Sequence, residues 1–203
     1  KSKFANLRSC NWQKLRFSNK EVESAIKYPK FSKNFKIFSG DKANRENLTG
    51  FIESKVLHFA VHSSSRNKVF NKDVGPAIIL SKISDKEDGI VTLDEIKNNL
   101  KLKVDLVILS SCESGLGENI GTDGLQSIAS TFKNIGARQV MYSLWKVDDL
   151  RTYLFMKEFY KNYNNYSSAS KALRETKLSF LNSKDPRKSD PFVWASFNII
   201  SSE

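Results

Sequence analysis

A short apolar run followed at once by a cysteine and a glycine-rich loop constrains this chain more than any other feature. The run consists of Val104 and residues 106–109, and it leads through two serines to Cys112. A short, nearly continuous apolar segment that ends in turn residues is typical of a strand buried on both faces, as in a parallel sheet. Cys112 is then expected just beyond the carboxyl end of a central strand, where open α/β sheets collect ligands and catalytic groups.

A second apolar segment, residues 55–61, also ends in a reactive side chain, that of His62. If the two strands are parallel neighbours, a thiol and an imidazole meet at one edge of the sheet, and together they form a nucleophile and its general base. Two alternatives stay open: Cys112 can be a small buried apolar residue, and His58 can compete as the base. His58 lies inside the predicted strand, where a buried, hydrogen-bonded histidine is the simpler interpretation. The spacing therefore favours His62 and Cys112 as a catalytic dyad, with Cys10 incidental.

The motifs around this pair resemble the CHAT domain proteases, relatives of caspases and separases. The resemblance is carried by residues 57–62, 88–96, 109–115, 121–125, 136–149 and 191–197, and it runs from about Phe17 to Ser201. It implies a caspase-like three-layer α/β sandwich, with a mostly parallel central sheet flanked by helices. It also implies a thiol protease, a hydrolase that cleaves a protein substrate through a Cys–His dyad. Two residues depart from the family: Ser63 stands where glycine is usual, and Ser114 where threonine is usual.

The resemblance assigns further roles at the same edge of the sheet. The backbone N–H groups of Ser63 and Cys112 are the expected oxyanion hole. A similar segment of separases ends in an aspartate that meets an arginine side chain, and its position corresponds to Asp149. A carboxylate there selects a basic residue before the scissile bond, with Asp148 and Glu113 as further candidates. The alternative is that Asp148 or Asp149 simply caps the helix that follows.

The glycine-rich segment after Cys112 is open to two interpretations. As a functional element it gates the substrate or responds to activation, as such loops do in caspase relatives; as a plain connection it only joins two elements. It lacks the Gly-Lys-Ser/Thr sequence of a phosphate-binding loop. We predict the gating role.

Composition limits which other classes of protein and of site are possible. The chain has 203 residues, of which 39% are hydrophobic and 27% charged, which suits one soluble α/β domain. Its two cysteines offer neither a disulfide framework nor a metal cluster, so we expect no metal or cofactor and a reducing, cytoplasmic compartment. No apolar run approaches the about 20 residues of a membrane span, and the first residues lack a signal-peptide pattern.

The net charge of +11 is spread over the whole length. It is explained by a lysine-rich solvated surface, and a partner in an RNA-containing effector complex is the alternative. A nucleic-acid-binding protein would need a clustered basic motif, which the sequence lacks.

Residues 1–16 are predicted to be an irregular basic arm, and residues 17–203 the CHAT protease domain. The family usually has a first core strand just upstream, and the arm contains no convincing one. We therefore expect the chain to be part of a longer protein with an upstream TPR-type region or a regulatory partner, in prokaryotic antiviral defence or cell death. The alternative is a catalytically silent CHAT module that acts as a protein-interaction domain, for which Ser63 is the one argument.

The hydrophobic periodicity predicts alternating strands and helices. Expected strands are residues 35–38, 55–61, 77–80, 89–91, 104–109, 139–144 and 192–200, the third and fourth paired as a hairpin. Expected helices are residues 41–54, 149–163 and 167–181, together with two that start at capping boxes, Ser18 with Glu21 and Thr92 with Glu95. Residues 121–135 are expected to be a loop that leads into a helix. Gly136 is expected at a helix C-cap, and Trp194 and Phe197 in the core of the last strand.

Overall fold

The computed structural model describes residues 15–48, 53–64, 68–69, 72–73, 76–82, 89–110 and 123–201. Its central sheet has the strand order β1 (Glu53–Phe59), β7 (Lys103–Leu109), β8 (Ala137–Ser143) and β9 (Phe197–Ser201). The first three strands are mutually parallel, and β9 runs antiparallel to β8. The predicted α/β class with a mostly parallel sheet is confirmed.

Strand β7 lies between β1 and β8 and is buried on both faces. Leu106, Val107 and Ile108 have no exposed surface. Val107 packs into the core on one side of the sheet, whereas Leu106 and Ile108 pack into the core on the other. The apolar run ahead of Cys112 is therefore a central strand, as its composition predicts.

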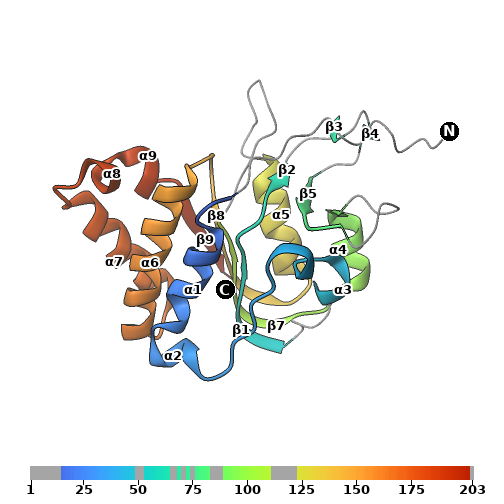
Figure 1. The fold of residues 1–203 in the computed structure, drawn as a ribbon, viewed down its shortest axis with the longest axis horizontal. Helices are drawn as coiled ribbons and strands as arrows, with labels where there is room; N and C mark the ends of the chain where they lie inside the picture. The colour runs from blue at the N-terminus through green and yellow to red at the C-terminus, as the bar shows by residue number, and fades with distance from the viewer. Residues whose placement is uncertain are drawn as a thin grey trace.

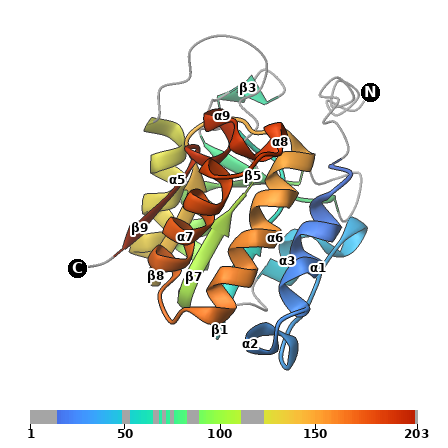
Figure 2. The same ribbon diagram turned by 90° about the vertical axis from the view of Figure 1, so that its left-hand side faces the viewer.

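Helices cover both faces of the sheet and complete the three layers (Figure 1). One layer contains α1 (Ser18–Ile26), α6 (Asp149–Asn165) and α7 (Ala169–Leu181), which Figure 2 turns toward the viewer. The other layer contains α4 (Leu93–Asn99) and α5 (Asp123–Asn134). Each layer buries its own apolar cluster against the sheet, so the expected helix–sheet–helix sandwich is present.

A second, smaller sheet consists of β2 (Ser63–Ser64), β5 (Ala77–Ile79) and β6 (Ile90–Thr92). β5 and β6 are antiparallel, which confirms the predicted hairpin pairing.

The remaining elements are short: α2 (Pro29–Ser32), η2 (Gly40–Lys42), α3 (Arg45–Leu48), β3 (Lys68–Val69), β4 (Lys72–Asp73), α8 (Pro186–Ser189) and α9 (Pro191–Trp194). None of the helices within the described ranges has both the length and the apolar character that crossing a bilayer requires.

The capping box at the start of α4 is present as predicted. The Thr92 hydroxyl accepts the Glu95 N–H at 3.3 Å, and Glu95 Oε2 accepts the Thr92 N–H at 2.8 Å. We expect Thr92→Ala to lower the free energy of unfolding by about 1 kcal/mol, since it leaves an N–H of the first turn without its acceptor. Urea denaturation measures the loss. Thr92→Ser keeps the hydroxyl and should stay within about 0.5 kcal/mol of the parent; an equal loss in both variants would contradict the capping explanation.

Two predictions for residues 33–54 are wrong. No strand forms over residues 33–39, all of which are described, and Phe35 and Ile37 are 49% and 37% exposed there. Within the described part of the predicted helix 41–54 the structure has η2 and α3, and β1 begins at Glu53; residues 49–52 lie outside the described residues. Residues 53–54 pair with the start of β7, so the tertiary ladder overrides the local helical pattern.

The predicted strand 192–200 is also wrong in its first half. Pro191 opens the one-turn helix α9, which contains Trp194, and β9 starts only at Phe197. The cause is local: the Asp190 side chain accepts the Phe192 N–H at 2.9 Å, and a proline at the first helical position is typical of a helix start. Phe197 is fully buried, as predicted.

Candidate functional site

The carboxyl ends of β1 and β7 lie side by side. Phe59 and Leu109 are partners in the last register pair of the two parallel strands. His62 is the third residue after Phe59, and Cys112 is the third residue after Leu109. The neighbouring, parallel strands that the predicted dyad requires are thus present. Cys112, Glu113 and the glycine-rich segment up to residue 122 lie outside the described residues.

The turn that carries His62 is tied to the smaller sheet. The His62 carbonyl accepts the Ile79 N–H at 2.8 Å, and the His62 side chain is half-buried. Ser63 opens β2, pairs with Ile78 and is 6% exposed. Serine adopts a β-ladder conformation without the freedom of glycine. The departure from the family at Ser63 is therefore compatible with the backbone of this chain.

His58, the competing histidine, is held in a buried polar cluster. Its Nε2 lies 2.9 Å from Glu21 Oε1 and 3.0 Å from Ser110 Oγ, and its Nδ1 lies 2.7 Å from the Tyr160 hydroxyl. The His58 and Glu21 side chains are 6% and 3% exposed. Burial, helped by the neighbouring Glu21 and Tyr163, raises the pKa of Tyr160 well above its usual range, so the hydroxyl keeps its proton.

The same cluster corrects the predicted capping box of α1. The N-cap is Phe17, which makes no side-chain cap bond, and the Ser18 hydroxyl donates to the Leu15 carbonyl at 3.2 Å. Glu21 points to His58 instead of back to the helix start. The sequence contains one signal for this: Glu21 and Ser24 stand at helical spacing on the inner face of α1, and both are buried.

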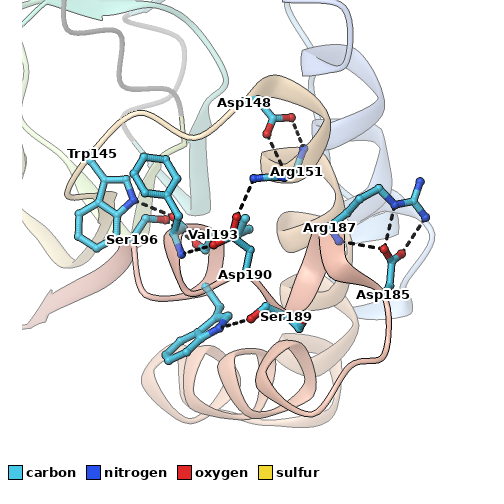
Figure 3. Close-up of polar contacts among 11 residues, drawn as sticks. Trp145, Asp148, Arg151, Asp185, Arg187, Ser189, Asp190, Val193 and Ser196 are labelled. Atoms are coloured by element: carbon cyan, nitrogen blue, oxygen red, sulfur yellow. Dashed lines mark hydrogen bonds and ion pairs between the residues drawn. The ribbon is translucent and has the colours of Figure 1, made fainter.

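Asp148 caps helix α6. Its carboxylate accepts the Arg151 N–H at 3.0 Å and pairs with Arg151 Nε at 3.2 Å. Arg151 also contacts Asp190 at 3.0 Å, which joins the start of α6 to the start of α9 (Figure 3). Of the two aspartates, Asp148 therefore has the capping role that the sequence left open between them.

Asp149 holds the segment before α1. Its Oδ2 accepts the Phe17 N–H at 2.7 Å, and the Phe17 ring stacks on Tyr153 with centroids 5.8 Å apart. Burial raises the pKa of the Asp149 carboxyl, while the N–H groups of Phe17 and Arg16 act to lower it. Asp149 is thus a partly buried carboxylate at the start of α6, the helix that follows the carboxyl end of β8, and β8 pairs in parallel with β7.

Two aromatic residues border the end of β8. Trp145 Nε1 donates to the Phe192 carbonyl at 2.7 Å, and the two rings are 5.6 Å apart (Figure 3). Phe192 is 53% exposed. The sequence pattern assigned Phe192 to a strand and so missed this contact. Within the described ranges, His, Cys, Asp and Glu form no group that could hold a metal ion.

Comparison with known proteins identifies the family. A profile of the CHAT domain matches residues 1–202. The chain is also similar to tetratricopeptide repeat protein 28 of Mus musculus, at 34% identity over 105 residues, and of Homo sapiens, at 33% over 105 residues. Each alignment covers 52% of this chain and 4% of the relative, so the chain spans only a small part of those proteins. Because the profile covers nearly every residue, this chain belongs to the CHAT domain family, a caspase-like protease family.

Proposed function

We propose that this CHAT domain is a cysteine endopeptidase with Cys112 as nucleophile and His62 as general base. The observation that carries the proposal is the parallel pairing of β1 with β7, whose last register pair is Phe59 and Leu109. Both proposed residues follow that pair at the same distance along the chain. On this proposal the Cys112 thiol and the His62 imidazole meet at that edge of the sheet as nucleophile and general base.

The proposed reaction balances without a cofactor. His62 takes the thiol proton, and the thiolate sulfur adds to the peptide carbonyl carbon. The N–H groups of Ser63 and Cys112 stabilise the oxyanion. As the C–N bond breaks, His62 returns the proton to the leaving amine, which leaves a thioester. A water molecule then gives a proton to His62 and its hydroxyl to the acyl carbon. The C–S bond breaks, and His62 returns the proton to the sulfur, which restores the thiol.

The proposed specificity is for a basic residue before the scissile bond, bound by Asp149. The Asp149 carboxylate is partly buried, and a carboxylate has about four acceptor positions. The backbone N–H groups of Phe17 and Arg16 act on this carboxylate, and a charged donor can use a remaining acceptor position. Asp148 is less suited because it already caps α6 and pairs with Arg151. Glu113 is a further candidate by its place next to Cys112.

The proposed regulation is by a TPR-type region or a partner protein. The two relatives are named as tetratricopeptide repeat proteins, and the matched segment is a small part of each of them. The gating role of the glycine-rich segment belongs to the same proposal. A cytoplasmic setting in prokaryotic defence or cell death is proposed from the family resemblance. An RNA-containing partner complex is proposed from the charge of +11 alone.

Cleavage of a mixed fluorogenic peptide library tests the activity. We expect the wild type to cleave after Arg or Lys, Cys112→Ala to be inactive, and His62→Ala to lose about 100- to 10,000-fold in kcat/KM. Asp149→Asn should lose the preference for basic residues while it keeps the dyad. Cleavage after other residues in the wild type would discard the Asp149 pocket and keep the protease.

Thiol alkylation tests the dyad even when no peptide is cleaved. In a Cys10→Ser background, Cys112 is the remaining thiol of the chain. A paired thiol should react with iodoacetamide well below pH 8, and His62→Ala should remove that reactivity. Identical alkylation profiles of the parent and His62→Ala would reject the dyad and leave a silent interaction module.

A further inference from the structure

Four polar side chains, three from helices or strands and one from the residue that follows β7, meet near the carboxyl edge of the sheet. They are Glu21 of α1, His58 of β1, Ser110 just after β7, and Tyr160 of α6, and each has at most a few per cent of its side chain exposed. The cluster includes no part of the proposed dyad. The cluster nevertheless lies where the β1–β7 pairing ends, since Phe59 is the neighbour of His58 and the register partner of Leu109.

One assignment of protons satisfies the cluster. The Tyr160 hydroxyl keeps its proton and donates to His58 Nδ1, so the imidazole proton is assigned to Nε2. Nε2, which carries this proton, lies 2.9 Å from Glu21 Oε1 and 3.0 Å from Ser110 Oγ. The Ser110 hydroxyl donates to the Phe59 carbonyl at 3.3 Å. The imidazole is therefore held on both of its nitrogens and cannot turn without breaking buried hydrogen bonds.

Ser110 links the two strands at the point where their ladder ends. Its backbone N–H and its hydroxyl both reach the Phe59 carbonyl, at 3.3 Å each, and its Oγ also meets His58. Beyond this point the β1–β7 pairing no longer fixes the distance between the two segments that follow these strands. The side chains of the cluster are almost fully buried, so these hydrogen bonds are stronger than exposed ones.

Two hydrogen bonds hold helix α1 and its N-cap residue at this edge of the sheet. Glu21 binds His58 of β1, and the Phe17 N–H binds Asp149 at the start of α6. Helices α1 and α6 belong to the layer that covers this face of the sheet (Figure 2). The imidazole thus connects the helical layer to the strand that leads to His62 and, through Ser110, to the strand that leads to Cys112.

We propose that His58 is a positioning residue of the proteolytic site, acting through Ser110 and Glu21 to set the spacing between the chain segments that carry His62 and Cys112. The proposal rests on the proposed function and deepens it. It assigns the two histidines of the chain separate roles, His62 in proton transfer and His58 in geometry.

The test compares alkylation of Cys112 by iodoacetamide as a function of pH, in the single-thiol Cys10→Ser background. The variants are Ser110→Ala, which removes the link between the strands, and Glu21→Gln, which keeps the shape of the side chain and removes its charge. We expect each to lower the rate at pH 7 about 3- to 10-fold and to move the midpoint of the profile toward that of a free thiol, about 8.5. Glu21→Gln carries the test if Ser110→Ala does not fold.

The matched control is Ser196→Ala. Ser196 is also fully buried, its hydroxyl donates to the nearby Val193 carbonyl at 2.7 Å, and it directly precedes β9, which is two strands away from β7 in the sheet. The control should leave the alkylation rate within about 2-fold of the parent, because the loss of a buried hydroxyl elsewhere does not move the site. Unlike a melting temperature, the midpoint of the profile responds to the surroundings of the thiol.

The outcomes separate the two proposals. A shifted profile in Ser110→Ala or Glu21→Gln, with an unshifted control, supports the positioning role. Profiles of both variants that superimpose on the parent, while His62→Ala differs, overturn the positioning role and leave the protease intact. A parent profile identical to that of His62→Ala rejects the dyad, and the positioning role falls with it.

Discussion

Replacing His58 by leucine is expected to lower the free energy of unfolding by about 3 kcal/mol, because it leaves the buried Glu21 carboxylate without its hydrogen-bond donor. Glu21 is 2% exposed, so water cannot replace the imidazole. The Tyr160 hydroxyl loses its acceptor in the same step. Since a domain of this kind is stable by about 5–15 kcal/mol in total, urea denaturation should show a large shift.

A double-variant cycle tests whether the loss of the Glu21–His58 pair causes this destabilisation. Glu21→Leu combined with His58→Leu removes the charge together with its partner, and replacing both members of a buried polar pair by apolar groups costs less than removing one. We expect the double variant to be more stable than His58→Leu alone, with a coupling energy of about 2 kcal/mol.

The other histidine is the matched control for this prediction. His62 is half-buried and lies after the end of β1, so His62→Leu should cost less than about 1 kcal/mol. If both histidine variants lost the same stability, or if the double variant lost the sum of the single losses, the buried pair would not be the cause.

The sheet could be predicted because its strongest signals are local. The apolar run of β7 shows that both faces of the strand are buried, and that property alone places it at the centre of a parallel sheet. The capping box of α4 and the hairpin of β5 and β6 likewise depend on residues close in sequence. Local chemistry and the final fold agree at these positions.

The secondary-structure predictions are wrong where the conformation of a segment depends on partners distant in sequence or on only a few residues. Residues 35–38 alternate like a strand but find no ladder, and residues 53–54 fit a helix but pair with β7. In α9, one proline with an aspartate cap outweighs the strand pattern of the residues that follow. Propensity is a weak guide in such segments, since tertiary pairing decides.

The candidate site divides in the same way. The places of His62 and Cys112 after two strands could be inferred from the sequence, and the order of those strands in the sheet agrees with that inference. The polar cluster could not be inferred. Glu21 and His58 are 37 residues apart, and Phe17 and Asp149 are 132 apart, so no short pattern reports either contact.

Gly136→Ala is the second substitution with a large expected effect, a loss of about 2–5 kcal/mol in the free energy of unfolding. Gly136 follows α5 with φ of +117°, where a residue with a side chain is strained. Its N–H donates to the Lys133 carbonyl at 3.1 Å, which ends the helix as a C-cap glycine does. An added Cβ would lie 2.0 Å from the Leu102 carbonyl oxygen.

Neither partner of this contact can easily move. Leu102 is buried ahead of β7, and its N–H donates to the Ile135 carbonyl at 2.7 Å, so the two backbones are hydrogen-bonded at the point of the clash. Relief requires a shift of the α5–β8 turn against the start of the central strand.

Gly40→Ala separates the clash from the backbone strain. Gly40 also has positive φ, +57°, but an added Cβ there meets no atom within 4 Å, so the substitution should cost only about 1–2 kcal/mol. Thermal and urea denaturation of both variants measure the difference. Equal losses would show that backbone strain alone explains Gly136. A clearly larger loss at Gly136 means that the close approach of the α5–β8 turn to Leu102, beside the strand that leads to Cys112, is what requires glycine.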